Sequence, residues 1–356
     1  MGILIAAIGL FVGYGTAYLA SGEVRYLTRA GLEEVRILDG RRPLEQMIAD
    51  PKTAPETRGL LSLVVDVRGF ADSLGLDAGD TYTSYSDVGR DTLLVVLSAS
   101  PKDCLCPYLW KYPIVGRVPY KGFFDTKMAA KEEKKLADRG LDTYLRPAGA
   151  FSTLGWFDDP LLSTAMGRDS VELAATVFHE ISHNTLYVKS ATPFNESFAQ
   201  YAGYRSAEAF FRARGDTLSA RRAADRWADE QVLGRYYTGL TDRLERFYAT
   251  RPDTAALEAG RAEIGSWARA QLDSTVGPAL RTYRLGPAPA RPVNNARLIS
   301  ATIYRTRLEL FEAWHERHGG NVKQAIAALG ALIEGAEGDE AFRRLEAALA
   351  QAPPGA

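Results

Sequence analysis

The sequence predicts a helix-rich α+β fold with a small sheet ahead of a mostly helical C-terminal half. Three observations support this. A β-branched apolar run bounded by turn residues, Asp91–Ser100, is typical of a strand. From Asp169 onward, apolar residues recur at helical spacing. The first residues, Ile3–Ala20, form an uncharged apolar stretch that suits an N-terminal anchor helix.

The composition is that of an ordinary globular protein. The chain has 356 residues, of which 46% are hydrophobic and 24% are charged. This is enough material for a buried core, so a metal ion would not be needed to hold the fold, and any metal site would favour catalysis. The net charge of −1 offers no broad basic surface, and we therefore expect no nucleic-acid partner.

The N-terminal stretch predicts attachment to a membrane. Ile3–Ala20 carries no charge and lies at the short end of the transmembrane length range. No clean cleavage site follows it, so we expect a retained anchor over residues 1–21, with a buried helix as the alternative. The rest, residues 22–350, is expected to form a single domain with an α/β part (22–168) and a helical part (169–350).

The first half of the chain alternates predicted helices with short strands. Amphipathic helices are expected over residues 22–38 and 55–75, the second ending at Gly75. Short strands or an ordered loop suit residues 113–125, which combine proline and glycine with aromatic residues. A charged helix over 126–140 is followed by strand and loop.

The second half predicts a series of helices. One begins at Asp169 or Ser170, and another is expected to be capped by Asn195 and to stop near Gly215. Long amphipathic helices follow, then a stiff linker over Gly286–Pro292 and a final group of helices.

The two cysteines, Cys104 and Cys106, carry little functional signal. They are separated by one residue, and no second cysteine pair accompanies them to complete a metal site. We expect them to be reduced or to form a local strained bridge, without a catalytic role.

The segment "FHEISH" predicts a catalytic metal site. His179 and His183 are four residues apart, so on a helix they share one face and both imidazoles can reach one ion. Glu180 is rotated by about 100° from His179, which puts it beside the ion as a general base. The alternative is a surface helix with two ordinary histidines.

A catalytic zinc ion needs a third protein ligand. A longer motif would place glycine and histidine three and six residues after His183, but Leu186 and Lys189 stand there. The other histidines, His315 and His318, precede two glycines at a helix end, where capping and helix-dipole roles explain them.

Glu196, in "NESFA", is the predicted third ligand. It follows His183 by thirteen residues, and the intervening "SATP" allows the chain to reverse, so that a second helix can pack across the first. The alternative is that Glu196 is only a charge near a helix N-terminus.

These segments resemble the bacterial "predicted aminopeptidase" family of gluzincin-like zinc peptidases. The similarity covers most of the chain, and its motifs are "DVRGFADSLGL", "SYSDVGR", "PIVGRVPYKGFFD", "FSTLGWFDDPLLST", "FHEISH", "FNESFAQY" and "NNARLISATIY". The resemblance implies a zincin-like fold and one zinc ion bound by His179, His183 and Glu196. It also implies peptidase activity, with Glu180 as base.

The resemblance and the charge pattern point to different sides of the membrane. Many family members carry a lipoprotein cysteine near the N-terminus, but "LFVGYGTAYLA" has none, so an uncleaved helix replaces it here. Family habit favours the inner membrane with the body in the periplasm. The arginines that follow the apolar stretch favour the cytoplasmic face as the alternative.

Two further segments are candidate substrate contacts. By resemblance, Phe151–Leu162 would pair with the substrate backbone as an edge strand, and Asp158 or Asp159 would hold an α-ammonium group; an ordinary turn is the alternative. Tyr304 or Arg297 could polarise the scissile carbonyl. Alternatively, Asn294–Asn295 caps a helix and Tyr304 is a core residue.

The leading hypothesis is therefore a membrane-anchored zinc peptidase, most simply an aminopeptidase, with a peptide as its partner. Water activated by the metal and by Glu180 would attack the peptide carbonyl. The alternatives are a zinc endopeptidase and a non-hydrolytic zinc-binding scaffold. The presence of a base argues against the scaffold.

Overall fold

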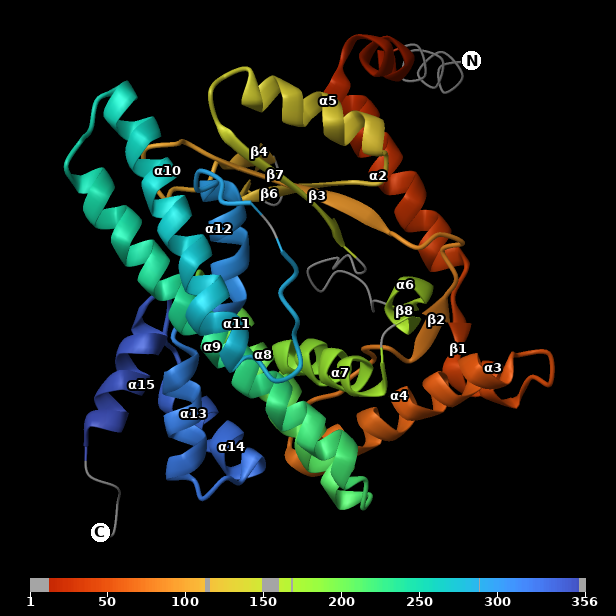
Figure 1. The fold of residues 1–356 in the computed structure, drawn as a ribbon. Coiled ribbons are helices and arrows are strands. Elements are labelled where there is room, and N and C mark those ends of the chain that lie inside the picture. The colour runs from red at the N-terminus through yellow and green to blue at the C-terminus, as the bar shows by residue number, and fades with distance from the viewer. Residues whose placement is uncertain (1–12, 113–115, 149–159, 168, 288, 352–356) are drawn as a thin grey trace, which may run out of the picture.

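The structure is a computed structural model that describes residues 13–112, 116–148, 160–167, 169–287 and 289–351. Helices predominate, and the described strands all lie in the first half of the chain (Figure 1). The predicted helix-rich α+β class is confirmed. The helices before the sheet and beside it are α2 (Gly22–Asp39), α3 (Leu44–Ala49), α4 (Pro55–Leu74), α5 (Thr126–Ala137) and α6 (Ser163–Met166).

The C-terminal half is a succession of helices that begins at α7. The predicted start at Asp169 or Ser170 is confirmed, because Asp169 is the N-cap and Ser170 the first helical residue. The elements are α7 (Ser170–Thr185), α8 (Thr192–Ala213), α9 (Thr217–Ala249), α10 (Thr254–Gln271), η1 (Leu272–Val276), α11 (Gly277–Ala279), α12 (Asn295–Thr302), η2 (Ile303–Arg305), α13 (Leu308–Arg317), α14 (Val322–Ile333) and α15 (Glu340–Ala350).

The described strands form three small sheets. One has the order β1-β2-β8, with β2 and β8 parallel; another has the order β6-β3-β7 and is antiparallel; β4 and β5 form a hairpin. The strands are β1 (Arg42–Pro43), β2 (Ser84–Ser86), β3 (Leu94–Ser100), β4 (Trp110–Tyr112), β5 (Gly116–Val118), β6 (Tyr120–Phe123), β7 (Asp142–Ala148) and β8 (Leu161–Leu162).

The two faces of the β6-β3-β7 sheet have different partners. Leu97 and Phe123 pack against Leu136 of α5, which covers the outer face (Figure 1). Because side chains alternate along a strand, Tyr120 and Arg146 point to the opposite face. On that side α12 packs against β3 and β7, and α7 and α8 lie beyond.

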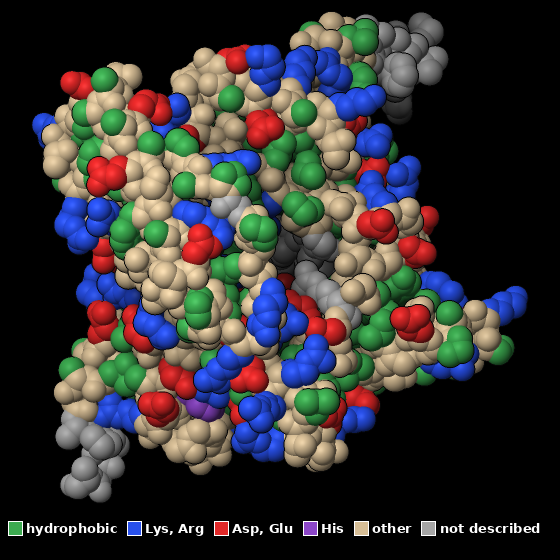
Figure 2. Space-filling model, in the orientation of Figure 1, with side chains coloured by type: hydrophobic (Ala, Val, Ile, Leu, Met, Phe, Trp, Pro, Cys, Tyr) green, Lys and Arg blue, Asp and Glu red, His purple; other side chains and the backbone are tan. Residues whose placement is uncertain are grey.

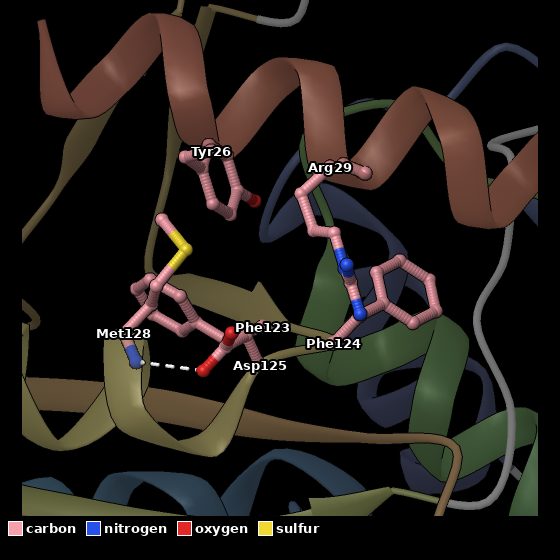
Figure 3. A pocket seen from close by; sticks show the side chains of 7 residues that line it. Tyr26, Arg29, Phe123, Phe124, Asp125 and Met128 are labelled. Carbon is pink, nitrogen blue, oxygen red and sulfur yellow. Dashed lines mark hydrogen bonds between the residues drawn. The ribbon is translucent and has the colours of Figure 1, made fainter. Parts of the chain in front are cut away.

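Helix α2 closes one edge of this sheet. Tyr26 and Arg29 of α2 face Phe123, Phe124 and Met128, and the cavity between them measures about 10 Å³ (Figure 3). That volume holds roughly one water, so this is a packing seam without room for a ligand.

The N-terminal stretch is described only in part. Residues 13–20 are helical, and Ser21 caps α2 by accepting a hydrogen bond from the Val24 N–H. Among the described residues, no helix combines the length and the apolar character needed to cross a membrane. Residues 1–12, where much of the predicted anchor falls, lie outside the described part.

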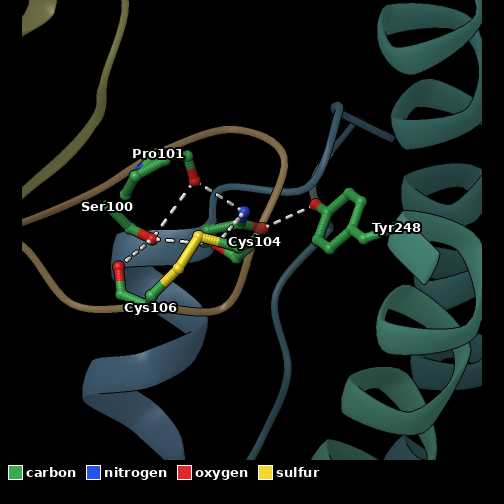
Figure 4. The surroundings of a disulfide bond; sticks show 6 residues. Ser100, Pro101, Cys104, Cys106 and Tyr248 are labelled. Atoms are coloured by element: carbon green, nitrogen blue, oxygen red, sulfur yellow. Dashed lines mark hydrogen bonds between the residues drawn. A yellow bond between two sulfur atoms is a disulfide. The ribbon is translucent and has the colours of Figure 1, made fainter. Parts of the chain in front are cut away.

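The cysteine loop is joined to the start of α12. Cys104 and Cys106 form a disulfide, so one of the two expected states is the one present. The Ser100 hydroxyl lies within hydrogen-bond distance of the carbonyl oxygens of both cysteines, while the Asn295 side-chain amide donates to the Cys104 carbonyl (Figure 4). The Tyr248 hydroxyl of α9 donates to the side-chain Oδ1 of Asn295, so the loop, α12 and α9 are linked through one buried side-chain amide.

A large apolar core holds α4, α7 and α8 together. Phe70, Phe178 and Phe210, one from each helix, pack edge to face with ring centroids 5.5–6.4 Å apart. Phe178 is fully buried and directly precedes His179. The apolar face of α7 is therefore fixed in the core, and its histidine face is turned toward α8 and the sheet.

Gly203 of α8 sets the distance between α7 and α8. A Cβ atom there would lie 2.7 Å from the Ala175 carbonyl oxygen and 3.4 Å from the Cβ of His179. Real Cβ atoms do not approach an oxygen that closely, so only glycine permits this crossing. The contact lies one turn from His179 on α7, and it therefore fixes the backbone around the histidines.

We predict that Gly203→Ala lowers the free energy of unfolding by about 1–3 kcal/mol, since overpacking forces the helices apart. Urea unfolding measures this. The matched control is Gly239→Ala in α9, where an added Cβ meets nothing within 4 Å; helix propensity should raise the stability there by about 0.5–1 kcal/mol. Equal stability of wild type and Gly203→Ala would contradict the close-crossing argument.

Candidate metal centre

Helix α7 is well determined by its own sequence. The Asp169 carboxylate accepts a hydrogen bond from the Glu172 N–H at 2.9 Å, a typical N-cap. Arg226 of α9 donates hydrogen bonds to the Asp169 carboxylate at 2.8 Å and to the Glu172 carboxylate at 2.7 Å. His179 and His183 lie on the same face of the helix, with ring centroids 5.0 Å apart.

Helix α8 begins earlier than predicted. Its first residue is Thr192 and its N-cap position is Ala191, so the prediction that Asn195 caps this helix is wrong. Asn195 lies inside the helix, where its buried side chain donates to the Val188 carbonyl and accepts from the Val188 N–H. These two bonds tie the α7–α8 connection to α8 and outweigh the capping preference of asparagine.

The connection brings Glu196 against the two histidines. Its Oε2 lies 3.4 Å from His179 Nε2 and 3.9 Å from His183 Nε2. Each residue can offer one atom such that all three atoms lie within 4.8 Å of one another. The side chains are 12–24% exposed, so the group is reachable but largely desolvated.

This donor set fits a metal ion such as zinc. Ligands at about 2.0–2.1 Å from a tetrahedral ion are separated by roughly 3.4 Å, which matches the 3.4 Å between His179 and Glu196 and is shorter than the 3.9 Å between His183 and Glu196. Two imidazole nitrogens and one carboxylate oxygen are a ligand set of catalytic zinc sites, which leave a fourth position for water or substrate. The triad His179, His183 and Glu196 can therefore hold a metal.

Electrostatics couples the three side chains. Burial opposes the charged form of His179, but its hydrogen bond to Glu196 and the charge of Glu180 leave its pKa raised. For His183, burial and the charge of His179 lower the pKa. Burial acts to raise the pKa of Glu196, but the hydrogen bond to His179 and the charges of His179, His183 and Arg146 together leave that pKa lowered. The carboxylate is thus ionised, as a metal ligand must be.

Glu180 lies beside the triad and outside it. Its negative charge acts on both histidines and on Tyr304. The side chain is half-buried, one residue after His179 on α7, so it projects at about 100° from that ligand. Glu180 thus lies next to the candidate ligands, and its role as a base stays a prediction. Gln200 of α8, which the sequence interpretation missed, is hydrogen-bonded to His179.

Tyr304 reaches the centre from η2. Its ring centroid is 6.2 Å from that of His179. Burial, and next the charge of Glu196, raise the pKa of the Tyr304 hydroxyl, which therefore stays protonated and can donate a hydrogen bond. Of the two expectations for this segment, Asn294 is indeed the N-cap of α12, while Tyr304 lies at the site.

Short contacts fix the position of η2. The Thr306 N–H donates to the hydroxyl of Ser197 at 3.0 Å, and Ser197 directly follows Glu196 in the sequence. The Arg305 guanidinium forms an ion pair with buried Glu230 of α9 at 2.7 Å. The η2 segment, which carries Tyr304, is therefore attached to α8, the helix that carries Glu196.

The sheet contributes two residues that sequence reasoning missed. Tyr120 is 44% exposed, and partial burial, followed by the charge of Glu196, raises the pKa of its hydroxyl. Arg146 is half-buried, and its positive charge acts on Glu196, Tyr304 and Tyr120. Strand alternation could have placed Tyr120 and Arg146 on one face of the sheet. No nearby residue in the sequence, however, indicates that this face lies toward the metal centre.

Of the other predicted substrate contacts, only part is described. The Arg297 side chain is exposed and lies over the Tyr144 ring, 5.9 Å from its centroid. Asp158 and Asp159 fall outside the described residues. Of the predicted edge strand Phe151–Leu162, Leu161 and Leu162 are described, and they form β8, which pairs with β2.

The remaining histidines lie elsewhere. His315 is buried, and its Nδ1 is 3.0 Å from the Tyr201 hydroxyl. His318 is the C-cap of α13, which confirms the predicted helix-end position. A cavity of about 310 Å³ beside His315 is lined by Arg205 of α8. Arg205 follows Glu196 by nine residues, so it projects from the opposite side of α8 and this cavity is separate from the triad.

Acidic and basic side chains are interspersed over the face of the molecule drawn in Figure 2.

The fold and this centre define a helix-rich α+β protein with a His-His-Glu group suited to a metal. A family model described as "Putative aminopeptidase" matches residues 25–343. The chain therefore belongs to this family, whose description suggests peptidase activity. Comparisons with curated proteins and with solved structures found no match.

We predict that Glu196→Ala weakens metal binding at least a hundredfold, since removing even an outer-shell partner costs about 10–100-fold. Metal content per chain after dialysis against a weak chelator measures the loss. His318→Ala is the control, because His318 caps α13 and should leave the metal content unchanged. Equal metal content in wild type and Glu196→Ala would remove Glu196 from the ligand set.

Proposed function

We propose that the protein is a zinc-dependent peptidase, most simply an aminopeptidase, that hydrolyses peptide bonds with Glu180 as general base. The observation that carries the proposal is the position of Glu196, whose Oε2 lies within 3.4 and 3.9 Å of the two histidine Nε2 atoms. Membership of a family described as "Putative aminopeptidase" supports the same activity.

When bound by the triad, a zinc ion would supply Lewis-acid activation of a water molecule and of the scissile carbonyl. The protein's own groups divide the remaining work. Glu180 accepts a proton from the attacking water and passes it to the leaving amine. Tyr304, protonated and beside His179, donates a hydrogen bond to the oxyanion that develops on the carbonyl.

The membrane attachment belongs to this proposal as well. The stretch Ile3–Ala20 has no charged residue and directly precedes α2. We propose that it holds the protein at the inner membrane with the catalytic part on the periplasmic side. Protease protection in spheroplasts tests this, and resistance of the body to added protease would place it on the cytoplasmic face.

We predict that Glu180→Gln lowers kcat about 10²–10⁴-fold, the usual contribution of a general base, while the metal content stays that of wild type. Hydrolysis of aminoacyl peptides by the metal-loaded protein measures the rate. Blocking the substrate N-terminus should abolish cleavage if the enzyme is an aminopeptidase. Full activity in a metal-loaded Glu180→Gln variant would falsify the proposed role of Glu180.

We also predict that Tyr304→Phe lowers kcat by about 10²-fold, the effect of losing one oxyanion donor, with little change in KM. The control is Tyr108→Phe, because Tyr108 lies with the α5-facing side of the sheet and away from the centre. A KM effect without a kcat effect would assign Tyr304 to substrate binding in place of oxyanion stabilisation.

A further inference from the structure

Arg146 is a cation at the candidate centre that the proposed mechanism does not use. Its charge acts on Glu196, Tyr304 and Tyr120, which come from three separate elements around the metal position. Its Nε atom is buried and has no hydrogen-bond partner. A half-buried guanidinium with an unpaired buried Nε atom is stabilised by an anion that it can bind.

The sheet register explains why Arg146 faces the centre. Arg146 of β7 and Gly122 of β6 both pair with Val96 of β3, so all three lie on one face of the sheet. Tyr120, two residues before Gly122, is on that face too. The opposite face is filled by Leu97 and its apolar neighbours under α5. The Arg146 side chain therefore points to the face of the sheet on which the metal centre lies.

The charges of the centre indicate what Arg146 would bind. Glu196 and Glu180 already have roles as ligand and base, and a metal ion adds positive charge to the same region. A substrate ammonium group beside Arg146 would be repelled, whereas a carboxylate would gain charge-assisted and bidentate hydrogen bonds. The protonated Tyr120 hydroxyl on the same face is a further donor for such a group.

We propose, on the basis of the proposed peptidase function, that Arg146 binds a substrate carboxylate next to the scissile bond. A peptide carries its main-chain carboxylate only at the C-terminal end, so this group lies on the leaving side of the bond. The preferred substrates are then very short peptides with a free C-terminus. An acidic side chain on the leaving residue is the second source of the same carboxylate chemistry.

The test compares four substrates on metal-loaded wild-type protein. The first pair is Ala-Ala and its C-terminal amide, and the second pair is the amides of Ala-Glu and Ala-Gln. We expect kcat/KM for the free acid to exceed that for the amide about tenfold to a hundredfold, mainly through KM. If the side chain is the source, the ratio appears in the second pair and is absent from the first.

Arg146 variants assign the preference to this side chain. Arg146→Met should reduce the acid-to-amide ratio to about one, and Arg146→Lys should restore part of it, because a lysine keeps the charge without the bidentate geometry. Arg139→Met is the matched control, since Arg139 lies over Tyr108 on the α5 side of the sheet and should keep the wild-type ratio. Metal content is measured on each variant.

The outcomes separate this proposal from the one on which it rests. Equal turnover of acids and amides in both pairs, or an unchanged ratio in Arg146→Met, would overturn the carboxylate role while leaving peptidase activity intact. Loss of metal in Arg146→Met with an unchanged ratio would assign Arg146 to positioning Glu196. Hydrolysis of none of the four peptides by metal-loaded protein would overturn the peptidase function, and the substrate class with it.

Discussion

The centre depends on how closely α7 and α8 approach each other. At Gly203 the two backbones are near enough that no side chain fits between them, and this contact lies beside His179. The phenylalanines on the other side of α7 fill the core and keep the helix from rotating. With both helices fixed, the hydrogen bonds between Asn195 and Val188 hold the short α7–α8 connection in place. The Glu196 carboxylate therefore faces the histidines.

The walls around this pair are attached to it by polar contacts. Ser197 accepts a hydrogen bond from the Thr306 N–H, which places η2 over the histidine face. Strand pairing with Ser98 and Val96 of β3 brings Tyr120 and Arg146 to the inner face of the sheet. The centre thus rests on the α7–α8 pair, and η2 and the sheet add a tyrosine and an arginine to its surroundings.

How much the sequence could predict depended on distance along the chain. The pairing of His179 with His183 follows from helical spacing, and Glu196 follows from a short reversal, so local rules sufficed to bring these three candidate ligands together. The cap at Asn195 was predicted wrongly because two buried bonds to Val188 outweigh a local preference. Arg146 could not be placed, since its position depends on strand pairing and on how the sheet packs over the helices.

The attachment of η2 through Thr306 has a consequence for how purified protein should be judged. The candidate ligands all lie between positions 179 and 196, whereas the groups expected to contact substrate are spread from Tyr120 to Tyr304. A chain that is cleaved or misfolded after α8 could still bind one equivalent of metal while Tyr304 is absent from the centre. Metal stoichiometry therefore reports on the integrity of one helical hairpin, and turnover reports on the whole molecule.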